Sequence, residues 1–183
     1  MPSAPRALPE KTWWIEQGRV IGGAYPGDLQ PAVARTKLEA LLDHGVGAFL
    51  NLMEPDETNV GGSAFAPYEP NARSLAAERG TGLEFGRLEI VDQSIPSVAR
   101  MREILAWLDD RLERGSLCYV HCWGGKGRTG TVAGVHLIRR GLATREDFVA
   151  VIRQLRGTDA QRGPAPENAQ QRDFVRAFPF SGP

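Results

Sequence analysis

The sequence predicts an α/β fold with a mainly parallel central sheet that is flanked by helices on both faces. Two observations support this prediction. Short apolar stretches of strand length alternate along the chain with longer stretches whose apolar residues recur at helical spacing. The strand-like stretches are apolar on successive residues, which is typical of strands covered on both faces. Because ligands of such sheets bind beyond the carboxyl ends of the strands, a site is expected in the loops that follow them.

Strands are expected where short apolar runs are bounded by turn residues. The first run is interrupted at Gln17-Gly18, which predicts two short strands around a turn within residues 13–23. A stretch rich in glycine, proline and asparagine, residues 55–70, shows no periodicity and is expected to be a long loop. Each remaining apolar run predicts one strand: buried strands at residues 48–53 and 117–120, and a further strand at residues 83–90.

Helices are expected where apolar residues at helical spacing follow a capping residue. Pro31 can occupy the first turn of a helix that ends near Gly45. Ser97 and Thr144 are the expected N-caps of two amphipathic helices, and Asn71 is the expected N-cap of a short one. The two remaining helices are expected at residues 131–140 and 166–177.

The 183 residues suffice for one domain with a full core. Residues 1–12 are rich in proline and polar residues and are expected to form a loose arm, and residues 13–183 are expected to form a single domain. Basic and acidic residues balance at 22 each, so no global field favours nucleic acid or a membrane as a partner.

The two cysteines, Cys118 and Cys122, are four residues apart on one strand and its end, which does not suit a disulfide. Cys118 is expected in the core. The chain shows neither a signal-peptide pattern nor an apolar stretch of membrane-spanning length. We therefore expect a protein of the reducing cytoplasm.

The most informative stretch is HCWGGKGRTG, which joins an expected strand to an expected helix. Its glycines, Gly124, Gly125 and Gly127, let the backbone turn its N–H groups inward, and such a nest at a helix N-terminus binds anions. These dipoles and the nearby Arg128 guanidinium favour a thiolate, so a lowered pKa is expected for the Cys122 thiol. Arg128 also has the planar donors that fit two phosphate oxygens. The stretch predicts attack of a thiolate on a bound phosphoryl group.

Cys-x5-Arg followed by Thr, with His before the Cys, resembles the signature loop of the protein tyrosine phosphatases, especially of the dual-specificity branch. The resemblance covers roughly residues 13–178 and implies the same fold, as one phosphatase domain. It implies that Cys122 forms a phosphocysteine intermediate and that Arg128 binds the phosphate and stabilises the transition state. Thr129 would offer its hydroxyl to the sulfur, and His121 would hold the loop by hydrogen bonds. The residues that would surround the phosphate are Trp123, Gly124, Gly125, Lys126, Gly127 and Arg128.

The leaving oxygen of an alkyl phosphate needs a proton donor on the same edge of the sheet. Asp92 follows the expected strand 83–90 and lies 30 residues before Cys122. The family places its acid in an Asp-x-x-x-Pro loop, which residues 92–96 match, so Asp92 would be the general acid. The alternative is a solvated loop aspartate.

Other acidic residues follow the strand 48–53 at the same edge. Glu54, Asp56 and Glu57 could pair with Arg128 or order the loop, although solvated loop acids are the simpler interpretation.

A stretch near the C-terminus faintly resembles the glutamine loop with which tyrosine-specific members place the hydrolytic water. Gln171 matches one of its glutamines, whereas Glu167 stands where the water-positioning glutamine is expected. We therefore favour a solvated helix face for Gln170 and Gln171. The tyrosine-recognition segment of those enzymes is not recognisable, which argues against strict phosphotyrosine specificity.

Lys126 could reach a second anionic group of a substrate. It could instead be solvated, or paired with one of the three acidic residues at this edge of the sheet, Glu54, Asp56 or Glu57 (the rim acids). Phosphoinositide phosphatases of the same superfamily carry Lys at this position and a second Lys directly after the cysteine, where this chain has Trp123. Packing is favoured for Trp123, against the helix, over stacking on a substrate ring.

We expect a phosphomonoester hydrolase without metal or other cofactor, acting on a phosphorylated protein or a small phosphomonoester. The alternatives are an inositol-phosphate or phosphoinositide phosphatase and a non-catalytic phosphate-binding pseudophosphatase.

Overall fold

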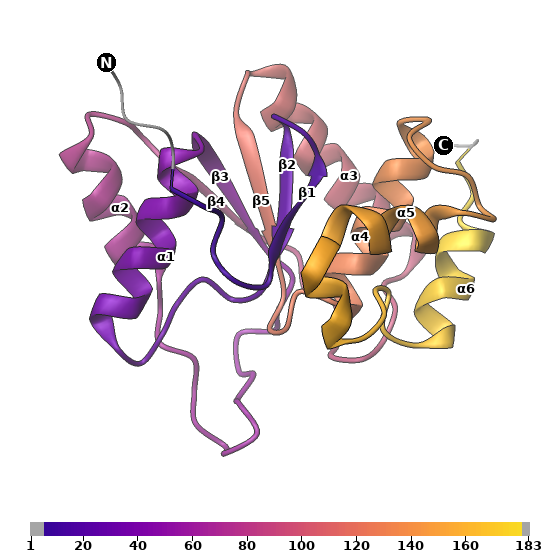
Figure 1. Ribbon diagram of the computed structural model, residues 1–183, viewed down its shortest axis with the longest axis horizontal. Helices are drawn as coiled ribbons and strands as arrows, with labels where there is room; N and C mark the ends of the chain where they lie inside the picture. Colours follow the sequence, from indigo (N-terminus) through magenta and orange to yellow (C-terminus); the bar gives the residue numbers. More distant parts are fainter. Residues whose placement is uncertain (1–5, 181–183) are drawn as a thin grey trace.

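The central sheet has five strands in the order β1-β2-β5-β3-β4 in the computed structural model, which describes residues 6–180 (Figure 1). β1 pairs with β2 in antiparallel orientation, and β2–β5, β5–β3 and β3–β4 are parallel pairs. The expected α/β class with a mainly parallel sheet is confirmed. The strands span Thr12–Glu16 (β1), Val20–Gly23 (β2), Val46–Asn51 (β3), Glu84–Arg87 (β4) and Leu117–His121 (β5).

Helices cover both faces of this sheet. In Figure 1, α1 and α2 lie to its left, and α3 to α6 lie to its right. Each side has its own apolar core. On β5, Tyr119 packs in the core under α1 and α2, whereas Cys118 and Val120 pack in the core under α3 and α4. The helices span Pro31–Asp43 (α1), Glu69–Glu78 (α2), Val98–Glu113 (α3), Gly127–Arg139 (α4), Phe148–Arg156 (α5) and Ala169–Ala177 (α6), with a 3₁₀ helix at Gly157–Arg162.

Cys118 is fully buried in the core, as the sequence predicts. Burial raises the pKa of its thiol to about 12, so this cysteine stays protonated. Both cysteines are free, as expected from their spacing.

The starts of α2, α4 and α6 differ from the sequence prediction, and α4 begins at Gly127 rather than at residue 131. Asn71 does not cap α2, because Pro70, whose fixed φ suits a first turn, lies inside a helix that begins at Glu69. The last helix begins at Ala169, later than the expected residue 166, because the Asn168 side chain accepts a hydrogen bond from the Gln171 backbone and caps it.

Of the other two expected caps, that of Ser97 is confirmed and that of Thr144 is wrong, because the N-cap of α5 is Asp147. The Ser97 hydroxyl accepts from the Arg100 backbone N–H at 3.0 Å and caps α3. Thr144 Oγ1 accepts from the Asp147 N–H at 3.2 Å, but this pair closes a turn, and α5 begins only at Phe148.

β4 is shorter than the expected strand, yet the chain continues alongside the end of β3. The Leu88 and Ile90 N–H groups donate to the carbonyls of Asn51 and Leu52, each at 3.0 Å. This pairing carries the chain to the carboxyl edge of the sheet and delivers Asp92 there.

Part of the predicted N-terminal arm contacts the domain. Arg6 forms an ion pair with Glu39 of α1 at 2.7 Å, and Leu8 packs against the core under α1. The rest of the predicted arm, residues 1–5, lies outside the described residues. Among residues 6–180, no helix is both long enough and apolar enough to cross a membrane.

Candidate active site

Cys122 follows β5, the middle strand of the sheet, and is 3% exposed at the base of a pocket. The loop after it turns at Gly125, where φ is +71° and a Cβ would lie 2.6 Å from the Gly23 backbone. Only glycine suits this close approach to the end of β2. α4 then starts at Gly127, so its N-terminus faces the sulfur as the sequence predicts.

Thr129 lies in the first turn of α4 and is fully buried. Its Oγ1 is 3.1 Å from Cys122 Sγ and 3.3 Å from the Gly23 carbonyl oxygen. A hydroxyl that donates to sulfur stabilises negative charge there. The contact expected between Thr129 and the cysteine is therefore present.

His121 is buried beneath the loop and links it to α2. Its Nδ1 is 3.4 Å from the Cys122 carbonyl oxygen, and its Nε2 is 2.8 Å from the Tyr68 hydroxyl. Because a carbonyl only accepts, Nδ1 carries the proton, and Tyr68 donates to Nε2. Burial lowers the His121 pKa to about 3, so the ring is neutral and keeps this tautomer. Sequence analysis did not find Tyr68, which lies in the aperiodic stretch before α2.

Arg128 is held from two sides. Its terminal nitrogens donate to both oxygens of the Glu57 carboxylate, with 3.0 Å between Nη2 and Oε2. Nη1 also donates to the Ile90 carbonyl at 3.1 Å. Burial disfavours the guanidinium charge and by itself would lower the Arg128 pKa. The hydrogen bonds to Glu57 and the nearby negative groups outweigh the effect of burial, so the pKa is raised. Arg128 is thus a permanently charged guanidinium in a fixed orientation, which suits an anion-binding role.

Glu57 is the one of the three rim acids that contacts Arg128. Its Oε1 also accepts from the Glu54 N–H at 2.9 Å, which closes the turn at the base of the long loop. Asp56 is exposed.

Asp92 stands at the mouth of the same pocket, where its side chain is 45% exposed. Its Oδ1 is 2.9 Å from Arg128 Nη2. The structure thus brings together Cys122, Arg128, Thr129 and Asp92, all predicted from the sequence. In the part of the chain that the structure describes, no cluster of three or more His, Cys, Asp or Glu could hold a metal ion.

The profile of a phosphatase family matches residues 22–142, a span that holds the cysteine loop and Asp92. Its description is "Polymorphic toxin system, DSP-PTPase phosphatase". The chain belongs to this family.

Several solved phosphatase structures have the same fold. This phosphatase is similar to Tk-PTP in its active form, at 26% identity over 92% of this chain and 96% of that one, with a TM-score of 0.65. PTPMT1 in complex with PI(5)P shares the fold at 19% identity over 92% and 94% of the two chains, with a TM-score of 0.65. The core catalytic domain of the PP-IP phosphatase SIW14 from S. cerevisiae shares it at 15% identity over 94% and 88%, with a TM-score of 0.63. The chain is a dual-specificity-like member of the protein tyrosine phosphatase superfamily.

The loop that carries Asp92 is held by α6 and its N-cap residue Asn168, which lie outside the residues that match the family. Gln171 Nε2 donates to the Ser94 carbonyl at 3.2 Å, and Asn168 Nδ2 donates to the Gln93 carbonyl at 2.8 Å. Gln171 is fully buried, so its predicted place on a solvated helix face is wrong. Its Oε1 also accepts from the Glu167 backbone N–H at 3.0 Å, so both ends of the buried amide have partners. Gln170 is exposed as predicted.

The remaining loop side chains complete a pocket of about 230 Å³. Lys126 lines it, and its Nζ is 2.8 Å from Glu167 Oε1, so its partner is not one of the rim acids. Trp123 packs as predicted, but its partner is the Phe65 ring of the long loop, with ring centroids 5.8 Å apart.

Proposed function

We propose that the chain is a cysteine-dependent phosphomonoester hydrolase that acts through a phosphocysteine intermediate on Cys122. One observation carries the proposal: a sulfur with a hydroxyl donor, a fixed guanidinium and a half-exposed carboxylate line one pocket. Each is a group that phosphoryl transfer to sulfur needs. This complete set argues against a pseudophosphatase.

In the first step the Cys122 thiolate attacks phosphorus, and the bond from phosphorus to the ester oxygen breaks. Phosphate oxygens replace the Asp92 carboxylate on Arg128 Nη2, and protonated Asp92 gives its proton to the leaving oxygen. In the second step Asp92 takes a proton from water, which attacks phosphorus. The sulfur–phosphorus bond breaks, and the Thr129 hydroxyl stabilises the departing thiolate.

The proposed substrates are phosphorylated proteins and small phosphomonoesters, in a reducing compartment such as the cytoplasm. A second candidate is an inositol phosphate, because Lys126 lines the pocket and could meet a second phosphate. Lys126 would have to exchange its ion pair with Glu167 for that contact.

The test is turnover of an aryl phosphate in the presence of a metal chelator. The wild-type protein is expected to release phosphate, and Cys122→Ser is expected to be slower by about a thousandfold or more. Cys118→Ala is the matched control, since that cysteine lies in the core, and it is expected to retain turnover. Comparable rates for Cys122→Ser and the wild type would overturn the proposal, as would loss of wild-type turnover with the chelator.

A further inference from the structure

A second pocket, of about 430 Å³, lies beside the catalytic pocket. Residues 9–12, the loop at 24–30 and part of the long loop, residues 59–66, supply most of its lining. Trp123 lines both pockets, so the two pockets adjoin at this side chain. Its volume lies within the range of small-ligand sites, about 300–1,000 Å³. The proposed chemistry does not use it.

One wall of the second pocket, at Tyr25, is tied to the catalytic loop. The Tyr25 N–H donates to the Trp123 carbonyl at 3.0 Å. The Tyr25 hydroxyl donates to the Ala66 carbonyl at 2.7 Å, which joins the wall to the long loop. A Cβ on Gly27 would lie 2.8 Å from that same carbonyl oxygen, so the two loops approach closely only with glycine there. These contacts shape the pocket without a ligand.

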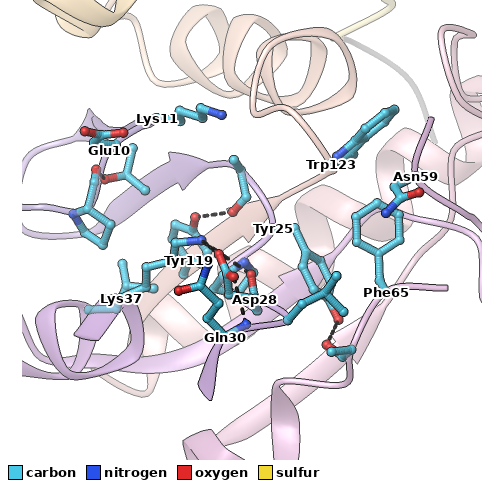
Figure 2. Close-up of a pocket in the computed structure, with 18 of the residues that line it drawn as sticks. Glu10, Lys11, Tyr25, Asp28, Gln30, Lys37, Asn59, Phe65, Tyr119 and Trp123 are labelled. Carbon is cyan, nitrogen blue, oxygen red and sulfur yellow. Dashed lines mark hydrogen bonds and ion pairs between the residues drawn. The ribbon is translucent and has the colours of Figure 1, made fainter. Parts of the chain in front are cut away.

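The two ends of the pocket differ in chemistry. Figure 2 shows Trp123, Phe65 and Asn59 at one end, with Tyr25 between them and the charged end. This aromatic end adjoins the catalytic pocket, because Trp123 belongs to both. Elsewhere in the lining, between Asp28 and Gln30 in the chain, Leu29 adds an apolar side chain that is 73% exposed. The aromatic end suits an apolar side chain of a ligand.

The charges of the lining cancel. Lys37 forms an ion pair with Asp28 at 2.8 Å. A neutral pocket does not attract a second phosphate group, which argues against a polyphosphorylated ligand. Asn59 Oδ1 already accepts from the Gly61 and Ser63 N–H groups, but its Nδ2 and the exposed Gln30 amide can pair with peptide groups, to which an acyl chain has no counterpart. The charged lining residues are two acidic and two basic ones: Glu10, Asp28, Lys11 and Lys37.

We propose that this pocket binds an apolar side chain of a phosphopeptide whose phosphoryl group occupies the catalytic pocket. The inference rests on the proposed function. An extended peptide advances about 3.3 Å per residue, so a residue within about three positions of the phosphorylated one reaches across Trp123. The pocket thereby selects protein substrates by the sequence around the phosphorylated residue.

The test is a set of phosphopeptides in which one leucine is moved through three positions on each side of the phosphorylated residue. Leucine at one of these positions is expected to raise kcat/KM by about tenfold or more, mainly by lowering KM. Leu29→Asp and Ala64→Asp, both at exposed lining positions, are expected to abolish this preference and to leave aryl phosphate turnover unchanged. Leu142→Asp is the matched control, because Leu142 is 50% exposed and lies between α4 and α5, away from the lining.

A flat leucine scan with normal aryl phosphate turnover would overturn the inference and leave the proposed function standing. Equal loss of the preference in Leu142→Asp and in the two pocket variants would overturn it too. So would an inositol polyphosphate hydrolysed about tenfold more efficiently than the best peptide. Absence of wild-type aryl phosphate turnover would instead overturn the proposed function.

Discussion

The Arg128 guanidinium and the Glu57 carboxylate are joined by hydrogen bonds from both terminal nitrogens, although 71 residues separate them in the chain. Both side chains are nearly inaccessible, at 1% and 11% exposure. The pair fixes the plane of the guanidinium and anchors the base of the long loop, which extends away from the body of the fold in Figure 1. In the proposed mechanism, phosphate therefore meets an arginine that is already oriented.

Glu57→Gln removes the negative charge from this pair and leaves a buried guanidinium with a neutral partner. We expect the free energy of unfolding to fall by about 2 kcal/mol and kcat/KM for an aryl phosphate to fall about tenfold. Denaturant unfolding and steady-state kinetics measure the two effects. Asp56→Asn is the control, since Asp56 is exposed on the same loop. Equal behaviour of the two variants would show that Glu57 does not position Arg128.

Asp92→Asn keeps the size of the side chain but cannot give up a proton. Hydrolysis of an alkyl phosphate should slow by about a hundredfold or more, and that of an aryl phosphate with a good leaving group by less. The fall in rate at alkaline pH should flatten, because it reports loss of the acid's proton. The pH–rate profiles of both substrates test this. An unchanged profile would move the role to Glu167, the other carboxylate that lines the pocket.

His121 makes the stability of the protein depend on pH. Its pKa is about 3 in the folded state because the ring is buried, against an ordinary value of 6.5. Between these values the unfolded chain binds a proton that the folded protein does not, so stability falls as the pH falls from about 6.5 to about 3, by at most about 1.4 kcal/mol per pH unit.

Chemical denaturation of the wild type and His121→Gln across this range tests the prediction. The variant should show the shallower dependence on pH. Burial also lowers the pKa of His136, but that residue is common to both proteins and cancels in the difference. If the free energies of unfolding of the two proteins changed in parallel with pH, the low pKa of His121 would be contradicted.

The sequence was sufficient to predict the side chains that meet at the catalytic pocket. Cys122 and Asp92 each follow a strand-like run, and parallel strands bring their carboxyl ends to one edge of the sheet. Arg128 follows from the loop itself, because a strand, a glycine-rich turn and a helix leave little freedom in placing it, whereas the role of Thr129 is implied by the resemblance to the phosphatase signature loop. These predictions rest on local pattern, on one topological rule and on the resemblance to the phosphatase signature loop.

The supporting contacts could not be predicted in this way. Tyr68 meets His121 across 53 residues and lies at the end of a stretch without periodicity. Gln171 carries a polar side chain in a polar segment, which favours a solvated face. Its burial depends on carbonyl groups of the Asp92 loop that arrive from a distant part of the chain. Such pairings are set by tertiary packing.

Direct detection of the phosphocysteine tests the central proposal most sharply. The protein is mixed rapidly with excess aryl phosphate and quenched in denaturant during the first turnover, and its peptides are analysed by mass spectrometry. Asp92→Asn is run in parallel, because loss of the base should slow hydrolysis of the intermediate and increase its yield. The account predicts a phosphoryl group on the peptide that contains Cys122 and a matching burst of the aryl alcohol. Turnover with no phosphoryl group on that peptide in either protein, or with the group on another residue, would contradict it.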